Sequence, residues 1–354
     1  MTALDHREPD RLPRDLWAGA EVSLRLQQHF GQANRDGLMD RWGADLRYVE
    51  GPSYVGQQFR THQDGSIEDL WGVRRETKHL AHGPYAWQYR HVKVSPLADM
   101  TTAAQIDTYD HWPSADWWDY STITADCDRY ASYAIVNAGD RLDRTAQLKP
   151  MMYLRGMEQT YVDLALNPQI TDAIIAHIRD YFLQYNRLVF QAAQGKLDIF
   201  MMGDDFGTQT GPMMSVDTWR RFFKDGFRAY IELAHEYGLK VMHHTCGSVV
   251  ELIPDFIECG LDILQSLQPR ARGMDLAFLK REYGRDLCFH GGVDIQHTLV
   301  NGSADEIRQM VRRLARNGKP DGGYIISTAH NIPPETPTDN ILTLLSAYDE
   351  FAAY

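Results

Sequence analysis

The 354-residue sequence predicts an α/β protein, a single (β/α)8 TIM barrel with an N-terminal extension. From about residue 130 onward, short apolar runs alternate with amphipathic segments, which is typical of parallel strands joined by helices. An open doubly wound sheet is the alternative, but no Gly-x-Gly-x-x-Gly follows an early strand. We therefore expect one domain over 1–354, with the extension and first strands in 1–125 and the main βα units in 126–354.

Eight strands are expected, because eight close a barrel of this kind. The first two are placed at Leu16–Trp17 and Leu46–Val49. The other six are the apolar runs Tyr133–Val136, Leu197–Met202, Leu239–His244, Leu261–Leu264, Asp286–His290 and Gly323–Ser327. Among the intervening helices, Asp217–Tyr237 begins after Ser215 and ends at Gly238, a residue type that commonly stops helices.

The region between residues 50 and 125 is rich in tryptophan and has no clear strand pattern. These residues are Trp71, Trp87, Trp112, Trp117 and Trp118. They either close the N-terminal end of the barrel, which is the simpler interpretation, or line a pocket for a flat organic ligand.

Composition and charge exclude several classes of protein. Hydrophobic residues make up 44% and charged residues 24%, which predicts a globular fold with a sizeable core. No apolar run approaches the ~20 residues that span a bilayer, and the first 15 residues are charged where a signal peptide would be apolar, so a cytoplasmic protein without a membrane partner is expected. A net charge of −12 argues against nucleic-acid binding.

The cysteine count predicts free thiols. The chain contains Cys127, Cys246, Cys259 and Cys288. Four cysteines are too few for a disulfide scaffold in a chain of this length, so a reducing compartment is expected. Cys259 precedes Gly260 at a predicted helix end and is expected to be structural, while Cys127 carries no functional signal.

Polar residues gather where five predicted strands end. In barrel enzymes the active site is built at the carboxyl ends of the strands. The five segments are Asp204-Asp205, His243 to Cys246, Gln265 to Gln268, His290 to Asp294 and Thr328 to Asn331. Five such ends in succession predict one functional site at the barrel rim.

His244 and Cys246 are the first two candidate metal ligands. Side chains alternate along a strand, so the imidazole and the thiol point to the same face, about 7 Å apart along the backbone. A catalytic zinc usually takes three protein ligands and keeps one position open, and His330 after the last strand is the best third ligand. The alternative is structural, because a buried cysteine often acts as a small apolar residue and a strand-end histidine often bonds a carbonyl.

Two other histidines, His243 and His290, lie at the predicted strand ends. His243 faces the opposite side of its strand and is expected to pack outside the barrel interior. Cys288 and His290 share one strand face and are the main competing ligand pair, although Cys288 would lie deeper in the barrel than a rim site requires.

Asp204, Asp205 and Asp294 are the candidate catalytic carboxylates. Adjacent carboxylates on an extended segment point apart, so only one of Asp204 and Asp205 is expected to face the site. Such a group can complete the metal's coordination or accept a proton from the substrate or product. The alternative for each aspartate is to cap a helix.

Several segments together resemble the uroporphyrinogen decarboxylase superfamily. They are Asp10 to Pro13, Gly203 to Gly207, His244 to Gly247, Gly260 to Leu264, Gly291 to Asp294, Gly322 to Ile325 and Pro333 to Pro337. The resemblance covers most of the chain in the same order and implies a barrel fold. Its true decarboxylases carry an arginine-rich N-terminal segment for their acidic substrate, whereas this chain has Ala18 to Ser23 there, so decarboxylation of uroporphyrinogen is not expected.

The chain is more similar to the corrinoid-linked methyltransferase branch. That resemblance implies a zinc ion held by a His-x-Cys pair, matched by His244 and Cys246, and by a third ligand near the end of the barrel. It also implies a cobalamin-type cofactor or a corrinoid protein as partner. The third ligand is a cysteine in thiol-alkylating members, and the corresponding residue here is His330.

This departure changes the expected substrate. Two neutral imidazoles and one thiolate leave zinc with a formal charge of +1, whereas a second thiolate would leave it neutral. A more electrophilic zinc polarises an oxygen donor better, which predicts methyl transfer involving a small O-methyl ether or methoxy aromatic. A thiol acceptor, a hydrolase or decarboxylase-like lyase acting without corrinoid, and a binding protein without activity remain alternatives.

No Asp-x-His-x-x-Gly segment is present, so we expect the corrinoid to be free or on a separate protein. A homodimer is compatible with the sequence, which does not set the oligomeric state.

Overall fold

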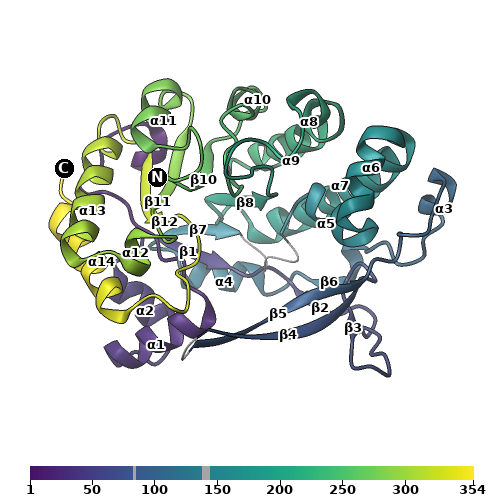
Figure 1. The fold of residues 1–354 in the computed structure, drawn as a ribbon, viewed down its shortest axis with the longest axis horizontal. Coiled ribbons are helices and arrows are strands. Elements are labelled where there is room, and N and C mark those ends of the chain that lie inside the picture. The colour runs from purple at the N-terminus through teal and green to yellow at the C-terminus, as the bar shows by residue number, and fades with distance from the viewer. Residues whose placement is uncertain (83–84, 138–143) are drawn as a thin grey trace.

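Seven parallel strands form one curled sheet in the order β1-β7-β8-β9-β10-β11-β12 (Figure 1). The structure is a computed structural model that describes residues 1–82, 85–137 and 144–354. The strands of this sheet are β1 (Leu46–Val49), β7 (Ala134–Asn137), β8 (Ile199–Gly203), β9 (Lys240–His244), β10 (Ile263–Leu267), β11 (Cys288–Val293) and β12 (Tyr324–Thr328). The predicted barrel is confirmed, and the second expected strand has the predicted bounds.

Residues 13–18 occupy the place of the eighth strand, between β12 and β1. Asp15 N donates to Ile326 O (3.1 Å), and Asp45 N, just before β1, donates to Arg14 O (2.9 Å). The regular strand predicted at Leu16–Trp17 is nevertheless wrong. Leu16 N donates to the Asp15 carboxylate (2.8 Å) instead of to a neighbouring strand, so the ladder is interrupted there.

The barrel interior has an apolar floor beneath a polar layer. The floor is made by Leu4, Trp17, Leu46, Val136, Ile199, Met201, Met242, Ile263, Cys288 and Ile325. Because alternate residues of a strand share a face, His244, Gln265 and His290 follow two residues beyond floor residues and also point inward. The fold therefore places polar side chains directly above a layer of buried apolar residues.

Helices cover the outside of the sheet, and the main core lies between the two layers. The helices are η1 (Thr2–Asp5), α1 (Ala20–Phe30), α2 (Arg35–Trp42), α3 (Ala103–Asp107), η2 (Ala115–Trp117), α4 (Ile123–Arg129), α5 (Leu148–Arg155), α6 (Met157–Leu166), α7 (Pro168–Ala193), α8 (Val216–Phe222), α9 (Lys224–Glu236), α10 (Ile253–Glu258), α11 (Leu276–Tyr283), α12 (Thr298–Asn301), α13 (Ala304–Gly318) and α14 (Thr338–Phe351). Among the described residues, none of these helices is both long and apolar enough to cross a bilayer.

The helix predicted over Asp217–Tyr237 is present as two helices, α8 and α9, which meet at Phe223. Its predicted start is confirmed, because the Ser215 hydroxyl accepts a hydrogen bond from Thr218 N (3.0 Å). Gly238 follows α9 with φ +75°, a conformation that glycine adopts without strain.

The tryptophan-rich region forms small sheets and packs on α7, outside the barrel. Its strands are β2 (Ser53–Tyr54), β3 (Ile67–Glu68), β4 (Arg74–His82), β5 (Tyr85–Val94) and β6 (Trp118–Asp119). Trp71 lies edge-on to Tyr181 of α7, with ring centroids 5.3 Å apart, and Trp118 Nε1 donates to Tyr181 OH (3.1 Å). The prediction that these residues close the barrel is therefore wrong for the described side chains. The side chain of Trp87 lies outside the described part.

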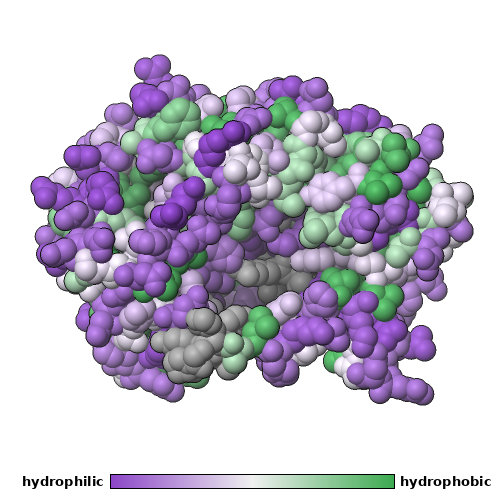
Figure 2. All heavy atoms as spheres, viewed as in Figure 1, coloured by the Kyte–Doolittle hydropathy of each residue, from purple (hydrophilic) through white to green (hydrophobic). Residues whose placement is uncertain are grey.

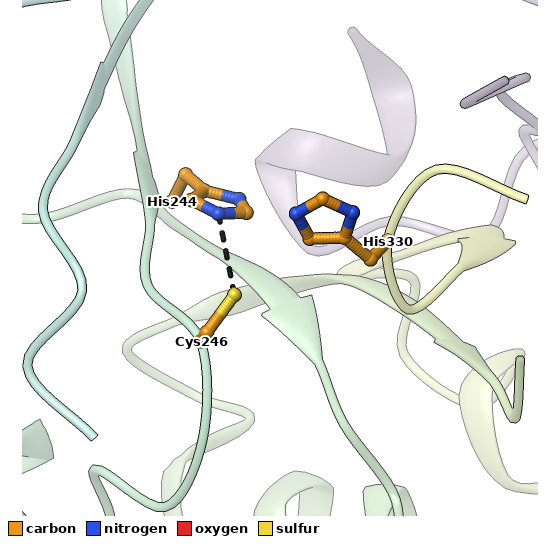
Figure 3. Close-up of side chains that lie close together, drawn as sticks. All are labelled: His244, Cys246 and His330. Carbon is orange, nitrogen blue, oxygen red and sulfur yellow. Dashed lines mark hydrogen bonds between the residues drawn. The ribbon is translucent and has the colours of Figure 1, made fainter. Parts of the chain in front are cut away.

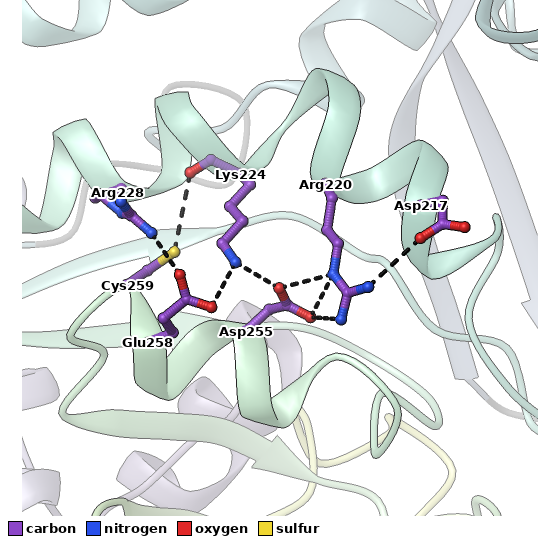
Figure 4. Close-up of polar contacts among 7 residues, drawn as sticks. All are labelled: Asp217, Arg220, Lys224, Arg228, Asp255, Glu258 and Cys259. Atoms are coloured by element: carbon purple, nitrogen blue, oxygen red, sulfur yellow. Dashed lines mark hydrogen bonds and ion pairs between the residues drawn. The ribbon is translucent and has the colours of Figure 1, made fainter.

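Ionic contacts join α10, which follows β9 in the chain, to α8 and α9, which precede it (Figure 4). The buried carboxylate of Asp255 accepts hydrogen bonds from Arg220 Nε (3.0 Å) and Lys224 Nζ (2.7 Å). Glu258 accepts from Lys224 (2.7 Å) and Arg228 (3.0 Å). Burial alone would raise the pKa of Asp255, but the bonds from Arg220 and Lys224 outweigh it and lower the pKa.

Replacing Asp255 with alanine should lower the free energy of unfolding by about 1–3 kcal/mol, because Lys224 loses a buried partner. Urea denaturation at neutral pH measures this difference. Asp217→Ala is the matched control: its carboxylate is 93% exposed and contacts Arg220 at 3.4 Å, so a change within about 0.5 kcal/mol is expected. The difference in unfolding free energy caused by Asp255→Ala should be largest above about pH 4, the ordinary pKa of aspartate. It should become smaller in stronger acid, where the carboxylate is protonated. Equal losses in both variants would contradict this assignment.

Candidate metal centre

His244, Cys246 and His330 come together at the carboxyl ends of β9 and β12 (Figure 3). Their ligand atoms all lie within 4.8 Å of one another. Tetrahedral zinc binds nitrogen at about 2.0 Å and sulfur at about 2.3 Å, which puts those two atoms roughly 3.5 Å apart. The distance from Cys246 Sγ to His244 Nε2 is 3.6 Å. The donor set and its spacing therefore fit zinc.

Gln265 on β10 fixes the orientation of the His244 ring. Its side-chain Oε1 accepts a hydrogen bond from His244 Nδ1 in the buried interior. Because Nδ1 then carries the proton, Nε2 presents its lone pair toward Cys246. Burial lowers the pKa of His244 well below its ordinary value, with a further contribution from Arg144, so the ring is neutral as metal binding requires.

His330 is held by its own loop. Asn331 N donates to His330 Nδ1 (2.8 Å), and Figure 3 shows the other ring nitrogen pointing towards His244. The His244 and His330 ring centroids are 5.6 Å apart, with the planes inclined by 68°. The two imidazoles thus approach one point from different directions.

Trp17, in the segment that closes the barrel, contacts both histidines. Its ring stacks on His244 (centroids 5.6 Å apart, planes inclined by 13°) and lies edge-on to His330 (6.3 Å, 79°). Trp17 Nε1 donates to Asp15 (2.9 Å) and lies 2.9 Å from Tyr48 OH. The indole is therefore fixed at both its face and its edge, and it limits the positions of the two rings.

Asp15 anchors this arrangement from below. Its buried carboxylate accepts hydrogen bonds from Tyr48 OH (2.5 Å) and from His290 Nε2 (2.9 Å), in addition to that from Trp17. His290 is therefore paired with Asp15, and Cys288 lies at the other end of the barrel, with Sγ 3.6 Å from His6 Nε2. The competing ligand pair of the sequence is not assembled, and Cys288 is deeper, as expected.

The remaining cysteines and His243 lie apart from the three ligands. His243 packs among Phe206, Phe227 and Phe256 outside the barrel interior, as predicted, and burial lowers its pKa to about 3. Cys127 and Cys259 are buried in the outer core. None of the four cysteines, all in the described ranges, forms a disulfide.

Asp204 and Asp205 diverge after β8, as expected. Asp204 is buried and accepts the backbone N–H groups of Gln147, Leu148 and Lys149 (2.7–2.8 Å) at the start of α5. Burial raises the pKa of Asp204 to about 6, against the opposing effect of those hydrogen bonds. Asp204 therefore holds the N-terminus of α5, and through it the position of Lys149.

Asp205 faces the candidate ligands. It accepts from Lys149 Nζ (2.6 Å) and Cys246 N (3.0 Å), and its Oδ1 lies 3.5 Å from His244 Nε2. Burial raises the pKa of Asp205, but the ammonium group of Lys149 and the hydrogen bond from Cys246 N oppose this effect, and the pKa lies below its usual range. Asp205 is thus ionised beside the three ligands.

Asp294 is not brought into this group. Its carboxylate accepts from Gln296 N (2.9 Å), His297 N (3.2 Å) and Thr298 N (3.2 Å), and so caps the start of α12. Arg270 lies 3.9 Å away. The catalytic role predicted for Asp294 stays a prediction.

The chain belongs to the uroporphyrinogen decarboxylase (URO-D) family. The family's sequence model matches residues 145–351, which include all three candidate ligands and the three aspartates. A solved methyltransferase from Methanosarcina mazei has the same fold, with a TM-score of 0.65 and 15% identity over 99% of this chain and 97% of that one.

Curated proteins that are similar to this chain include methyltransferases of Methanosarcina species. A methylated-thiol–coenzyme M methyltransferase of Methanosarcina mazei is 22% identical over 206 residues, 58% of this chain and 52% of that protein. A methylcobamide:CoM methyltransferase of Methanosarcina barkeri is 27% identical over 141 residues, 40% of this chain and 39% of that protein. The chain thus spans about half or less of the length of these relatives.

Proposed function

We propose that this protein is a zinc-dependent methyltransferase that moves a methyl group between a small O-methylated substrate and a corrinoid. The observation that carries the proposal is the convergence of His244, Cys246 and His330 at the barrel rim, with ligand atoms within 4.8 Å. The similarity to a methylcobamide:CoM methyltransferase supports the corrinoid as the second reactant. We infer that the corrinoid is free or carried by a separate protein.

The three ligands set the character of the metal. Two neutral imidazoles and one thiolate give a formal charge of +1 with zinc, which leaves it electrophilic. Zinc in this set would act as a Lewis acid toward the ether oxygen that loses its methyl group. This ligand set supports an O-methyl ether or methoxy aromatic over a thioether.

In the proposed demethylation the methyl carbon leaves the ether oxygen and bonds to reduced cobalt. The C–O bond breaks with both electrons remaining on oxygen, and the cobalt supplies the pair for the new bond. The alkoxide or phenolate takes a proton from water on release. In the reverse direction, ionised Asp205 is placed to accept the proton of an incoming hydroxyl.

The aspartates have different proposed roles. Asp205, which lies 3.5 Å from His244 Nε2, is the candidate fourth ligand in the absence of substrate and the candidate proton acceptor in its presence. Asp204 is a positioning residue, because it fixes the start of α5 and hence Lys149, the partner of Asp205. Asp294 positions the loop after β11 through its cap on α12.

A methyl-transfer assay with paired substrates tests the proposal. The zinc-loaded chain is mixed with cob(I)alamin and either a methoxy aromatic or the same ring carrying a methylthio group, and methylcobalamin is followed by absorbance. Zinc at one per chain and faster transfer from the oxygen compound are expected. Preference for the sulfur compound would overturn the substrate assignment. Release of methanol or phenol without corrinoid would instead indicate a hydrolase.

A further inference from the structure

Asp205 lies beside the candidate metal centre without belonging to it. Its Oδ1 is 3.5 Å from His244 Nε2, yet no carboxylate of the described residues joins the three ligands whose atoms all lie within 4.8 Å of one another. Nitrogen and oxygen ligands of a tetrahedral zinc ion, each bound at about 2.0 Å, lie roughly 3.3 Å from each other. Asp205 is therefore close to this spacing from one ligand but lies outside the whole set.

Both oxygens of Asp205 accept hydrogen bonds from groups other than the ligand side chains. Oδ2 accepts from Lys149 Nζ (2.6 Å), and Oδ1 accepts from the backbone N–H of Cys246 (3.0 Å). The contact with Lys149 joins opposite charges, and such hydrogen bonds are roughly twice as strong as those between neutral groups. The carboxylate can approach a metal only if it moves away from these two donors.

Lys149 is itself held in place by its backbone. It is the second residue of α5, and its N–H donates to the buried carboxylate of Asp204 (2.8 Å). A charged lysine has no lone pair for a metal and is repelled by a nearby cation. Its position beside the metal centre therefore indicates an effect on Asp205 rather than on the metal directly.

The pair of Lys149 and Asp205 is reachable from solvent. Their side chains are 36% and 30% exposed, whereas that of His244 is 7% exposed. Figure 2 shows a hollow near the middle of the viewed face, bordered mainly by hydrophilic side chains, in the region where Figure 1 labels β1 and β7. A polar ligand can therefore approach the barrel strands from this side of the molecule.

We propose that Lys149 is a positioning residue that holds Asp205 away from the fourth coordination position of the metal. Asp205 is then at most a weak fourth ligand, and a substrate oxygen can take the position. A bound carboxylate would also lower the formal charge of the centre from +1 to zero and weaken it as a Lewis acid. The proposal rests on the proposed function for the zinc ion, and its tests measure metal binding as well as methyl transfer.

Lys149→Met tests this role, because methionine has a similar length and no charge. The freed carboxylate should bind zinc, so zinc affinity should rise about tenfold in a competition titration with a chelator, while methyl transfer should fall about tenfold. Lys149→Arg keeps the charge and should keep the zinc affinity of the wild-type chain. A variant that folds poorly would lose zinc, so a gain in affinity cannot come from damage to α5. An unchanged or lower zinc affinity in Lys149→Met overturns the proposal.

The same substitution in an Asp205→Asn background is the matched control. An amide is a much poorer zinc ligand than a carboxylate, so Lys149→Met should no longer raise zinc affinity there. A gain of equal size in both backgrounds would mean that the lysine acts by charge repulsion on the metal, and it would contradict the role given to Asp205.

Access to the fourth position can be measured without a methyl donor. Imidazole, a neutral ligand, should bind the cobalt(II)-loaded chain and change its visible absorbance, and Lys149→Met should weaken this binding about tenfold. Equal imidazole binding in the two chains overturns the proposal. Absence of methyl transfer in the wild-type chain, with both metal-binding results as expected, would instead contradict only the proposed function.

Discussion

Replacing His244 with alanine should remove the zinc and lower methyl transfer by more than about 100-fold. Changes to groups that merely hold a zinc ligand cost about 10–100-fold in affinity or activity, so loss of the ligand itself should exceed that range. Cys246→Ser should act in the same direction, because a hydroxyl is a poorer zinc ligand than a thiolate. Metal analysis after gel filtration, together with the cobalamin assay, measures both effects.

The adjacent histidine provides a matched control. His243 is on the same strand but points into the aromatic cluster, and neither of its ring nitrogens has a hydrogen-bond partner in the structure. His243→Leu should therefore keep zinc and activity, and its stability should be equal or higher because a buried, unsatisfied polar group is removed. The metal assignment would be contradicted if His244→Ala and Cys246→Ser retained zinc. It would also be contradicted if His243→Leu lost zinc to the same extent.

Gln265→Leu tests how much of the site depends on ring orientation. The substitution removes Gln265 Oε1, the atom that accepts the hydrogen bond from His244 Nδ1, and leaves the three ligands unchanged. Zinc affinity is expected to fall by about 10–100-fold, less than for loss of a ligand, as a competition titration with a chelator would show. An unchanged affinity would mean that the neighbouring Trp17 ring alone is enough to hold His244.

The fold was predictable where periodicity and burial agree. Leu46–Val49 is an apolar run with clear ends, and its predicted bounds match β1. The predicted end at Leu264 was too early, because β10 continues through Gln265 and Ser266, which are polar but fully buried. Polar residues at the carboxyl end of a barrel strand can belong to the strand when they face a site. A prediction from hydropathy alone therefore ends the strand too early.

The candidate site was predictable only where it depends on strand geometry. His244 is the last residue of β9 and Cys246 lies two residues further along, so alternation puts both side chains on one face, and barrel closure brings the loop of His330 to the same rim. Trp17 and Asp15 were missed because they act from an irregular segment that replaces a strand. Lys149 was missed because its place depends on how Asp204 caps α5, a contact across more than 50 residues of sequence.

Substituting His330 with glutamate should retain zinc but reduce methyl transfer from an ether by about 100-fold. A glutamate carboxylate has a reach from Cβ similar to that of the imidazole Nε2, so it can replace the ligand. It adds one negative charge to the set and takes the formal charge of the metal centre from +1 to zero, which weakens the electrostatic stabilisation of charge developing on the ether oxygen. The cobalamin assay at saturating zinc measures this loss.

His330→Gln separates charge from shape. Glutamine has nearly the same size and reach as glutamate but keeps the ligand neutral, so the formal charge with zinc stays at +1. If charge controls the reaction, the glutamine variant should bind zinc more weakly than the glutamate variant yet transfer methyl faster once zinc is saturating. Equal rates in the two variants would show that ligand charge does not govern the reaction, and the argument for an oxygen substrate from His330 would then fail.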